Sequence, residues 1–383
     1  ALTNEQATRF YVRAVRSAAG LHYEDSQLLE NPYVLYEGDR FVVPTSDDER
    51  LERVTLETID RGAFPADAVA QKHPLPEQSH MSGPRDKRRV RALIIAQLED
   101  AAQSSGHTML PEDLVVLGIR NAKLEPPCPV SEDVIEAVAE FFSYEVSRTA
   151  LKGGKPALQL FRYVAFKKLL SSQIHTRVRQ GMRFAIPDDW RARLDNLLPK
   201  LDVTDKDEVR AREEKAAALA ELAASRFSVL VGPAGAGKTT VLRALCQHEQ
   251  IAARGILLLA PTGKARVQLS QRCGHDAQTL AQFLTNCGGR YDGRTGIYKT
   301  VPGAPYIGCK TIIIDEASML TEDMLGALFD AVKGSVERLI LVGDPRQLPP
   351  IGAGKPFFDA VTFLTPVGAG ALFPKVGKGY AEL

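Results

Sequence analysis

Three groups of residues in the second half of the chain have the types and spacing needed for phosphate chemistry. The first is Gly232-Pro-Ala-Gly-Ala-Gly237-Lys238-Thr239, followed by Thr240, which is a complete G-x-x-x-x-G-K-T sequence. Its glycines let the backbone curl so that N–H groups face phosphates, while Lys238 reaches the β- and γ-phosphates and Thr239 ligates Mg²⁺. We predict a nucleotide site formed by Gly232, Pro233, Ala234, Gly235, Ala236, Gly237, Lys238, Thr239 and Thr240.

The second group is a pair of carboxylates that follows an apolar run at 311–314. Asp315 is placed to hold the Mg²⁺ shell, and Glu316 is suited to orient and deprotonate an attacking water. The structural alternative is that Asp315 or Ser318 simply starts a helix. Because the pair occurs with a phosphate loop, we favour hydrolysis of the nucleotide.

The third group follows the apolar run at 338–342 and contains Gln347 within a Pro- and Gly-rich stretch. The amide of Gln347 can donate to a phosphate and accept from water, so it is a candidate sensor of the γ-phosphate. Taken alone, such a stretch is as well explained by a plain turn.

These residues need a sheet to bring them together. The runs at 227–231, 255–260, 311–314 and 338–342 are nearly all apolar, as in parallel strands buried on both faces, and helical stretches separate them. Ligands of such sheets bind beyond the carboxyl ends of the strands, where the three groups lie. We predict an α/β P-loop domain with a parallel sheet over 206–383, preceded by a mainly α-helical domain over 1–205.

Length and composition limit the class of protein. The 383 residues are enough for two or three domains, and 44% hydrophobic with 25% charged residues is typical of a globular chain. No apolar run approaches the ~18 residues of a membrane helix, so no membrane partner is expected. Five cysteines without C-x-x-C spacing indicate reduced thiols and a cytoplasmic protein.

The formal net charge is +1, but the basic residues are unevenly distributed. Residues 151–200 hold eleven Lys and Arg against three Asp, a local balance of +8, and a second basic cluster lies at 85–91. Both suit the phosphate backbone of a nucleic acid, although a solvated helix face explains them equally well.

Four segments together resemble superfamily 1 DNA helicases of the RecD-like type. They are Gly232–Thr240, Ala260-Pro-Thr-Gly-Lys-Ala265, Asp315-Glu-Ala-Ser-Met319 and Gly343-Asp-Pro-Arg-Gln-Leu-Pro-Pro350. More weakly, Leu29–Leu35 and Ser105–Pro111 are similar to the helix-hairpin-helix-bearing region ahead of the motor in longer RecD-like helicases. The resemblance implies a RecA-like ATPase lobe, ATP and Mg²⁺ as cofactors, and catalytic roles for Lys238, Glu316 and Gln347.

The resemblance also implies a DNA partner, either single-stranded DNA or DNA with a single-stranded end. Thr262 and Lys264 would contact its phosphates, although a plain strand-to-helix turn explains them too. A β-hairpin is expected near 286–308, with Tyr291-Asp-Gly293-Arg294 at its turn, and the family carries a pin beside the DNA fork here. A surface hairpin without that role is equally compatible.

The chain departs from the family pattern at three points. Lys215 stands where a Gln usually reads adenine, and Thr279-Leu280-Ala281 lacks a usual His. After Gly354 a Gly-rich tail, 366–383, stands in place of the second RecA-like lobe, whose arginine stabilises the transition state. A fragment with weak hydrolysis is the expectation from this pattern.

Two functions follow from these observations. The first is an ATP-dependent helicase or translocase, running 5′ to 3′ by resemblance to the family. The second is a nucleotide-dependent switch or scaffold that binds partners or DNA without unwinding it. Stimulation of ATP hydrolysis by single-stranded DNA distinguishes them.

Overall fold

The computed structural model describes residues 2–19, 21–39, 53–180, 183–200, 202–293, 296–303, 306 and 308–383. It divides into two compact units, Ala1–Val164 with Arg294–Ile297, and Ala165–Gly293 with Tyr298–Leu383. The units therefore separate inside helix α11 (Phe161–His175) and not at 205. The reason is packing, because Leu170, Trp190 and Leu194, which lie between the two positions, are all buried with strand residues of the second unit. A functional division at 205 stays a prediction.

The first unit is mainly helical, as expected, and also contains a small antiparallel sheet in the order β1-β3-β2. The apolar residues Val90, Leu93, Ile94 and Leu98 are buried on its longest helix. The helices are α1 (Asn4–Tyr11), α2 (Arg13–Ala18), α3 (Asp25–Glu30), α4 (Val34–Asp39), α5 (Leu56–Ala63), α6 (Asp67–Lys72), α7 (Lys87–Ser104), α8 (Glu112–Asn121), α9 (Glu132–Ala137) and α10 (Ala139–Phe142). The strands are β1 (Met109–Pro111), β2 (Val146–Ala150) and β3 (Pro156–Leu160).

The second unit is built on a seven-stranded sheet in the order β11-β12-β4-β10-β9-β5-β6. All its pairs are parallel except β11 with β12, so the sheet is mostly parallel, as a RecA-like fold requires. Its strands are β4 (Phe227–Val231), β5 (Ile256–Ala260), β6 (Ala277–Thr279), β9 (Thr311–Ile314), β10 (Arg338–Gly343), β11 (Val376–Gly377) and β12 (Tyr380–Glu382). A separate two-stranded sheet pairs β7 (Tyr291–Asp292) with β8 (Ile297–Tyr298).

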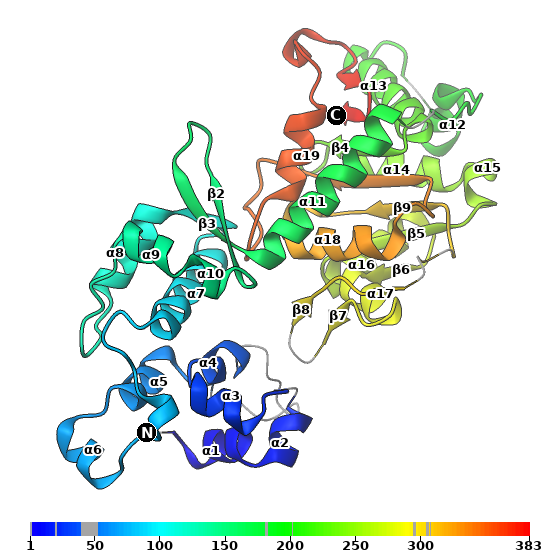
Figure 1. Ribbon diagram of the computed structural model, residues 1–383. Coiled ribbons are helices and arrows are strands. Elements are labelled where there is room, and N and C mark those ends of the chain that lie inside the picture. Colours follow the sequence, from blue (N-terminus) through cyan, green and yellow to red (C-terminus); the bar gives the residue numbers. More distant parts are fainter. Residues whose placement is uncertain are drawn as a thin grey trace. The chain divides into compact units, whose positions relative to one another are not determined.

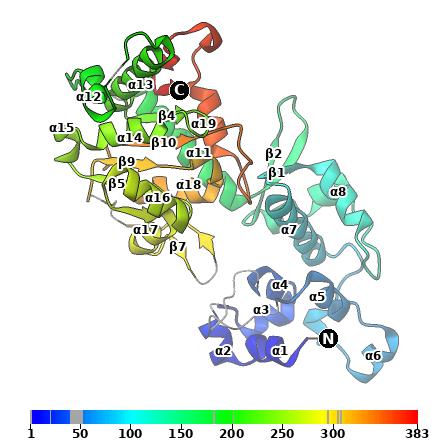
Figure 2. The ribbon, with the colours of Figure 1, turned by 180° about the vertical axis from the view of Figure 1, so that it is seen from behind.

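Helices cover both faces of the seven-stranded sheet, which Figures 1 and 2 show from opposite sides. Successive strand residues point to opposite faces, so Val229 and Val231 pack with α11, α17, α18 and α19, whereas Leu230 packs with α12 to α16. This double burial explains the nearly continuous apolar runs in the sequence. The helices are α12 (Trp190–Leu197), α13 (Lys206–Ala224), α14 (Lys238–Cys246), α15 (Glu249–Ala252), α16 (Gly263–Cys273), α17 (Leu280–Asn286), α18 (Glu322–Val332) and α19 (Pro356–Leu364).

The segment 366–383, which the sequence suggested was a Gly-rich tail, contains β11 and β12. Strand β12 pairs with β4, and the N–H of Leu383 donates to the carbonyl of Val231 at 2.9 Å. The tail is thus part of the sheet beside the phosphate loop. Within the described residues, no helix is both long enough and apolar enough to cross a membrane.

Candidate nucleotide site

The phosphate loop joins the fully buried strand β4 to helix α14. Gly235 and Gly237 have φ angles of 85° and 91°, a region that residues with a β-carbon rarely adopt, so glycine is needed at both positions. Gly237 caps α14, whose first residue is Lys238. The N-terminal N–H groups of α14 therefore face the loop, where they favour a bound anion.

Lys238 folds back into the loop. Its Nζ donates to the carbonyl oxygens of Gly232 at 2.6 Å and Pro233 at 3.0 Å. The ammonium is therefore held at the mouth of the anion site, with backbone acceptors that a phosphate oxygen can replace.

The carboxylates lie at the end of β9, two strands away from the loop. Register aligns Ile314 with Leu341 on β10, and Leu341 with Val229 on β4, so Asp315 and the loop leave the same edge of the sheet. Glu316 has φ 53°, a left-handed conformation that is uncommon for a residue with a side chain. Its N–H donates to Oδ1 of Asp315 at 2.9 Å.

Burial raises the pKa of both carboxyl groups. The positive charge of Lys238 opposes the rise in the pKa of Asp315. The negative charge of Asp315 adds to the rise in the pKa of Glu316, and the charge of Lys238 opposes it. Lys238 thus acts electrostatically on both carboxylates. A raised pKa makes an ionised carboxylate a stronger proton acceptor, which suits Glu316 to act as a general base.

Gln347 is exposed in the loop that follows β10. Strand β10 lies between β4 and β9 in the sheet. Ser318 lies two residues after Glu316, and its hydroxyl donates to Oε1 of Gln347 at 3.4 Å. The N–H of Gly232 donates to the carbonyl of Gly343 at 3.3 Å, which ties the phosphate loop to the strand that carries Gln347. The three predicted groups of residues are therefore brought to one edge of the sheet.

A divalent cation fits the side chains present. Thr239 is half-buried on the first turn of α14, and in the described ranges neither its hydroxyl nor Oδ2 of Asp315 has a recorded hydrogen-bond partner. These regions also contain no cluster of three His, Cys, Asp or Glu side chains that could form a cage for a metal. Mg²⁺ characteristically takes one carboxylate or hydroxyl together with phosphate oxygens and waters, which suits this sparse set.

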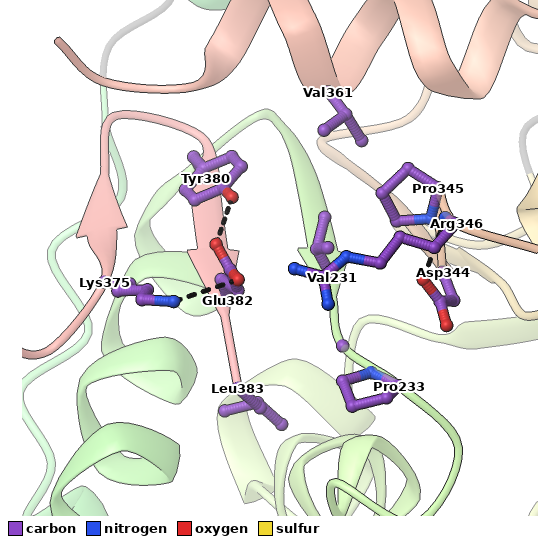
Figure 3. A pocket seen from close by; sticks show the side chains of 11 residues that line it. Val231, Pro233, Asp344, Pro345, Arg346, Val361, Lys375, Tyr380, Glu382 and Leu383 are labelled. Atoms are coloured by element: carbon purple, nitrogen blue, oxygen red, sulfur yellow. Dashed lines mark hydrogen bonds and ion pairs between the residues drawn. The ribbon is translucent and has the colours of Figure 1, made fainter. Parts of the chain in front are cut away.

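A cavity of about 360 Å³ opens beside the first residues of the phosphate loop (Figure 3). Arg346 extends into it from one wall, and on the opposite wall Glu382 accepts from Tyr380 at 2.7 Å and Lys375 at 3.1 Å. Burial disfavours the ionised form of Glu382, but these hydrogen bonds outweigh it and lower its pKa. Sequence reasoning missed Arg346, whose only signal is its place directly before Gln347.

The two predicted DNA contacts, Thr262 and Lys264, differ in whether the side chain already has a hydrogen-bond partner in the protein. Thr262 caps α16, because its Oγ1 accepts from the N–H of Ala265 at 3.2 Å. Lys264 is exposed, and no described residue is recorded as its partner. The turn expected as the structural alternative is therefore present at Thr262, and contact with DNA stays a prediction for both residues.

Most of the basic side chains singled out by charge counting are paired with acids or carbonyls. In the cluster at 85–91, Arg89 is fully buried against Asp60, while Arg88 binds Asp86 and Arg91 binds Glu37. In 151–200 the ion pairs are Lys155–Asp113, Arg162–Glu99, Arg183–Glu221, Arg191–Asp195, Arg193–Asp188 and Arg193–Glu249. Arg177 instead donates to the carbonyls of Val336 and Lys333. Among the described residues, most of these basic side chains therefore already bind partners within the protein.

The hairpin expected near 286–308 exists as the β7–β8 pair, although Arg294 of its turn lies outside the described residues. Arg290 anchors its base. Arg290 is 3% exposed, and its Nε donates to Oδ2 of Asp330 on α18 at 2.7 Å, while Asp330 also accepts from the N–H of Val301 at 2.9 Å.

Comparisons with known proteins agree with this geometry. A family model described as an AAA domain matches residues 210–367. The ATP-dependent RecD2 DNA helicase of Deinococcus radiodurans is 29% identical over 280 residues, which are 71% of this chain and 36% of that protein. The RecBCD enzyme subunit RecD of Mycolicibacterium smegmatis is 33% identical over 184 residues, 42% of this chain and 32% of that subunit.

A third relative, an uncharacterised protein of Methanocaldococcus jannaschii, is 24% identical over 364 residues, which are 89% of this chain and 29% of that protein. The similarity therefore extends into the first unit. The chain spans about a third of the length of the curated relatives that it matches over most of its own length.

Proposed function

The chain belongs with the RecD-like superfamily 1 helicases over its P-loop domain, and from that premise we propose that it is an ATP-driven DNA helicase or translocase. The observation that carries the proposal is the meeting of three groups at one sheet edge: Lys238 on the loop, the pair Asp315 and Glu316, and Gln347. A binding module needs only the first group, whereas hydrolysis needs all three.

In the proposed reaction, the loop N–H groups and Lys238 bind the β- and γ-phosphates. Thr239 and Asp315 hold Mg²⁺, which neutralises charge on the phosphates when bound. Glu316 takes a proton from the attacking water, for which its raised pKa suits it. The amide of Gln347, whose Oε1 is held by Ser318, keeps its N–H groups to donate to the γ-phosphate.

On the nucleic-acid side, we propose that Lys264 and Thr262 bind the phosphates of single-stranded DNA. Lys264 is the better supported of the two because its ammonium is exposed, whereas Thr262 already caps a helix. We further propose that residues 1–205 form a DNA-docking region of helix-hairpin-helix type. The similarity of relatives over 71% and 89% of this chain supports a shared role for that region.

The test is ATP hydrolysis by the 383-residue chain with and without a single-stranded oligonucleotide. The motor proposal expects stimulation of at least ~10-fold, lost in Glu316→Gln. Equal turnover with and without DNA would overturn the motor and favour the nucleotide-dependent switch. We propose 5′ to 3′ polarity from resemblance alone, and displacement of a strand from a 5′-tailed but not a 3′-tailed duplex tests it.

A further inference from the structure

Cys246 and Cys273 end two helices that pack against each other. Cys246 is the last residue of α14, which begins at the phosphate loop, and Cys273 is the last residue of α16, which begins directly after Thr262. The two helices are in contact, and both cysteines belong to one buried core, at 0% and 1% exposure. All five cysteines of the chain are free, so the pair is reduced.

The two thiols form a hydrogen bond with each other. This bond places the sulfur atoms side by side, so a small shift of the side chains is enough to close a disulfide of about 2.05 Å. Each cysteine is also the terminal residue of its helix. Helix ends open locally more readily than helix interiors, which gives a small oxidant access to buried sulfur atoms there.

The groups around the pair favour a thiolate at Cys273. The hydrogen bond from Cys246 lowers the pKa of Cys273, and the charges of Arg243 and Arg272 lower it further, against burial and the charge of Asp315. The same hydrogen bond and burial raise the pKa of Cys246. Arg243 lies in the last turn of α14 and Arg272 in the last turn of α16. Because the thiolate is the nucleophile, Cys273 is the sulfur that reacts first.

We propose that Cys246 and Cys273 are a redox-sensitive pair, which a hydroperoxide converts to a disulfide that restrains α14 against α16. First, the sulfur of Cys273 bonds to one peroxide oxygen and the O–O bond breaks. The other oxygen leaves as water with the proton that the thiol gave up, so Cys273 becomes a sulfenic acid. The sulfur of Cys246 then attacks that sulfur, the S–S bond forms, and the hydroxyl leaves as a second water with the Cys246 proton. The two thiols are oxidised and the peroxide is reduced.

The disulfide would join the two helices that begin at the proposed nucleotide and DNA contacts. Lys238 is the first residue of α14, and Lys264 lies in the first turn of α16. Packed helices transmit changes by small sliding movements, and a covalent bond between them prevents such sliding. We therefore expect oxidation to weaken the stimulation of ATP hydrolysis by DNA. This effect rests on the proposed function, whereas formation of the bond does not.

The first test treats the reduced chain with hydrogen peroxide and maps its peptides by mass spectrometry without a reductant. We expect a peptide linked through Cys246 and Cys273, with a mass lower by two hydrogen atoms. In Cys246→Ser the sulfenic acid has no partner thiol, so dimedone should label Cys273. Cys287→Ser is the matched control and should form the same bond as the original chain. Thermal melting of each variant without peroxide checks that it is folded.

Cys287 also gives an internal comparison, because it is more exposed than Cys273 but burial raises its pKa. Cys273 should be oxidised at least ~10-fold faster than Cys287, since reactivity follows the thiolate. Earlier oxidation of Cys287 would show that exposure alone sets the order, and it would overturn the proposal. A map without the linked peptide would overturn it too.

The second test measures ATP hydrolysis with and without single-stranded DNA, before and after peroxide. Stimulation by DNA should fall at least ~5-fold on oxidation and return with dithiothreitol. In Cys273→Ser peroxide should leave the stimulation unchanged. Full stimulation in the cross-linked chain would overturn the restraint of α14 against α16. If the reduced chain shows no stimulation, the proposed function fails, while the peptide map still decides whether the disulfide forms.

Discussion

The ammonium of Lys238 lies 2.6 Å from the carbonyl oxygen of Gly232, inside the loop that it helps to form. The same ammonium lowers the pKa of Asp315 and of Glu316 against the effect of their burial. One side chain therefore holds the loop and balances the charge of both carboxylates. Its removal should affect nucleotide binding far more than folding.

Lys238→Ala should lose nucleotide binding while keeping its stability without nucleotide within about 1 kcal/mol, because the lost hydrogen bonds are to partly exposed carbonyls. In the original chain, ATP at 100 times its dissociation constant should add about 2.7 kcal/mol to stability. Thermal melting with and without Mg-ATP measures both quantities. Lys200→Ala, at an exposed position of the same unit, should keep the full nucleotide effect. An unchanged nucleotide effect in Lys238→Ala would contradict the site.

Hydrolysis should lose rate at acid pH with a midpoint above that of an ordinary glutamate. Burial and Asp315 raise the pKa of Glu316, and a general base works only when ionised, so the rate falls as pH falls through that raised value. Glu316→Gln should lower turnover by about 10²–10⁴ and keep nucleotide binding. The charge of Asp344 also raises this pKa, so Asp344→Asn should move the acid limb to lower pH. The turnover rate of each variant is measured from pH 5 to 9. If the acid limb of the Asp344→Asn profile has the same midpoint as that of the original chain, Glu316 is not the base.

The strands that carry the site were predictable because their burial on both faces leaves a continuous apolar run. The ranges 227–231 and 311–314 match β4 and β9, and 338–342 falls one residue short of β10. Strand β12 was not predictable, since three residues carry no periodicity and its place beside β4 depends on a long-range pairing. Segment 366–383 therefore looked like a tail until the pairing was known.

Side-chain partners outside the motifs were the least predictable part of the site. The sequence shows that Lys215 lies on a helix, but its contact with Gly237 depends on how α13 is rotated against the sheet. Similarly, charge counting cannot reveal that Arg193 pairs with Glu249, 56 residues away. The motif residues were predictable because their types and spacing are dictated by the phosphate itself.

Stability should fall as pH rises from about 4.5 to about 7 because of Glu322. Burial, with a smaller contribution from Asp359, raises the pKa of Glu322 to about 7 against the opposing charge of Lys167, and Asp323 adds to the rise. A carboxyl group whose pKa is raised in the folded state stabilises it when protonated, and this contribution is lost as pH rises through the folded pKa.

Glu322→Gln should therefore be more stable than the original chain at pH 8 by on the order of 2 kcal/mol, and should differ little at pH 5. Urea unfolding at the two pH values measures this. Glu213→Gln, at an exposed position, serves as the control. Equal effects of Glu322→Gln at both pH values would refute the assignment.

Binding of single-stranded DNA should distinguish Lys264, which has no partner among the described residues, from the paired Arg193. Lys264→Ala should weaken binding for all sequences and reduce the salt slope by about 1, because one phosphate contact is lost. Arg193 already binds Asp188 at 2.6 Å and Glu249 at 3.0 Å, so Arg193→Ala should leave the slope unchanged. Fluorescence anisotropy of a labelled oligonucleotide over a NaCl series gives both slopes. If only Arg193→Ala reduced the salt slope, the basic residues of 151–200 and not Lys264 would be the DNA contact.

The Arg290–Asp330 pair should be the strongest ionic contribution to the base of the hairpin. Both side chains are largely buried, and Asp330 also accepts from Val301, so removal of the arginine leaves a carboxylate with too few donors. Arg290→Met should therefore destabilise the unit by about 3–5 kcal/mol. Arg290→Met with Asp330→Asn should cost at least ~1 kcal/mol less than the sum of the single changes, since the buried charge is gone.

The same cycle at the more exposed pair Arg210–Glu214, 3.7 Å apart, should be additive. Urea unfolding of the four chains in each cycle measures the coupling, and additivity at Arg290–Asp330 would mean that the backbone contacts alone hold the hairpin.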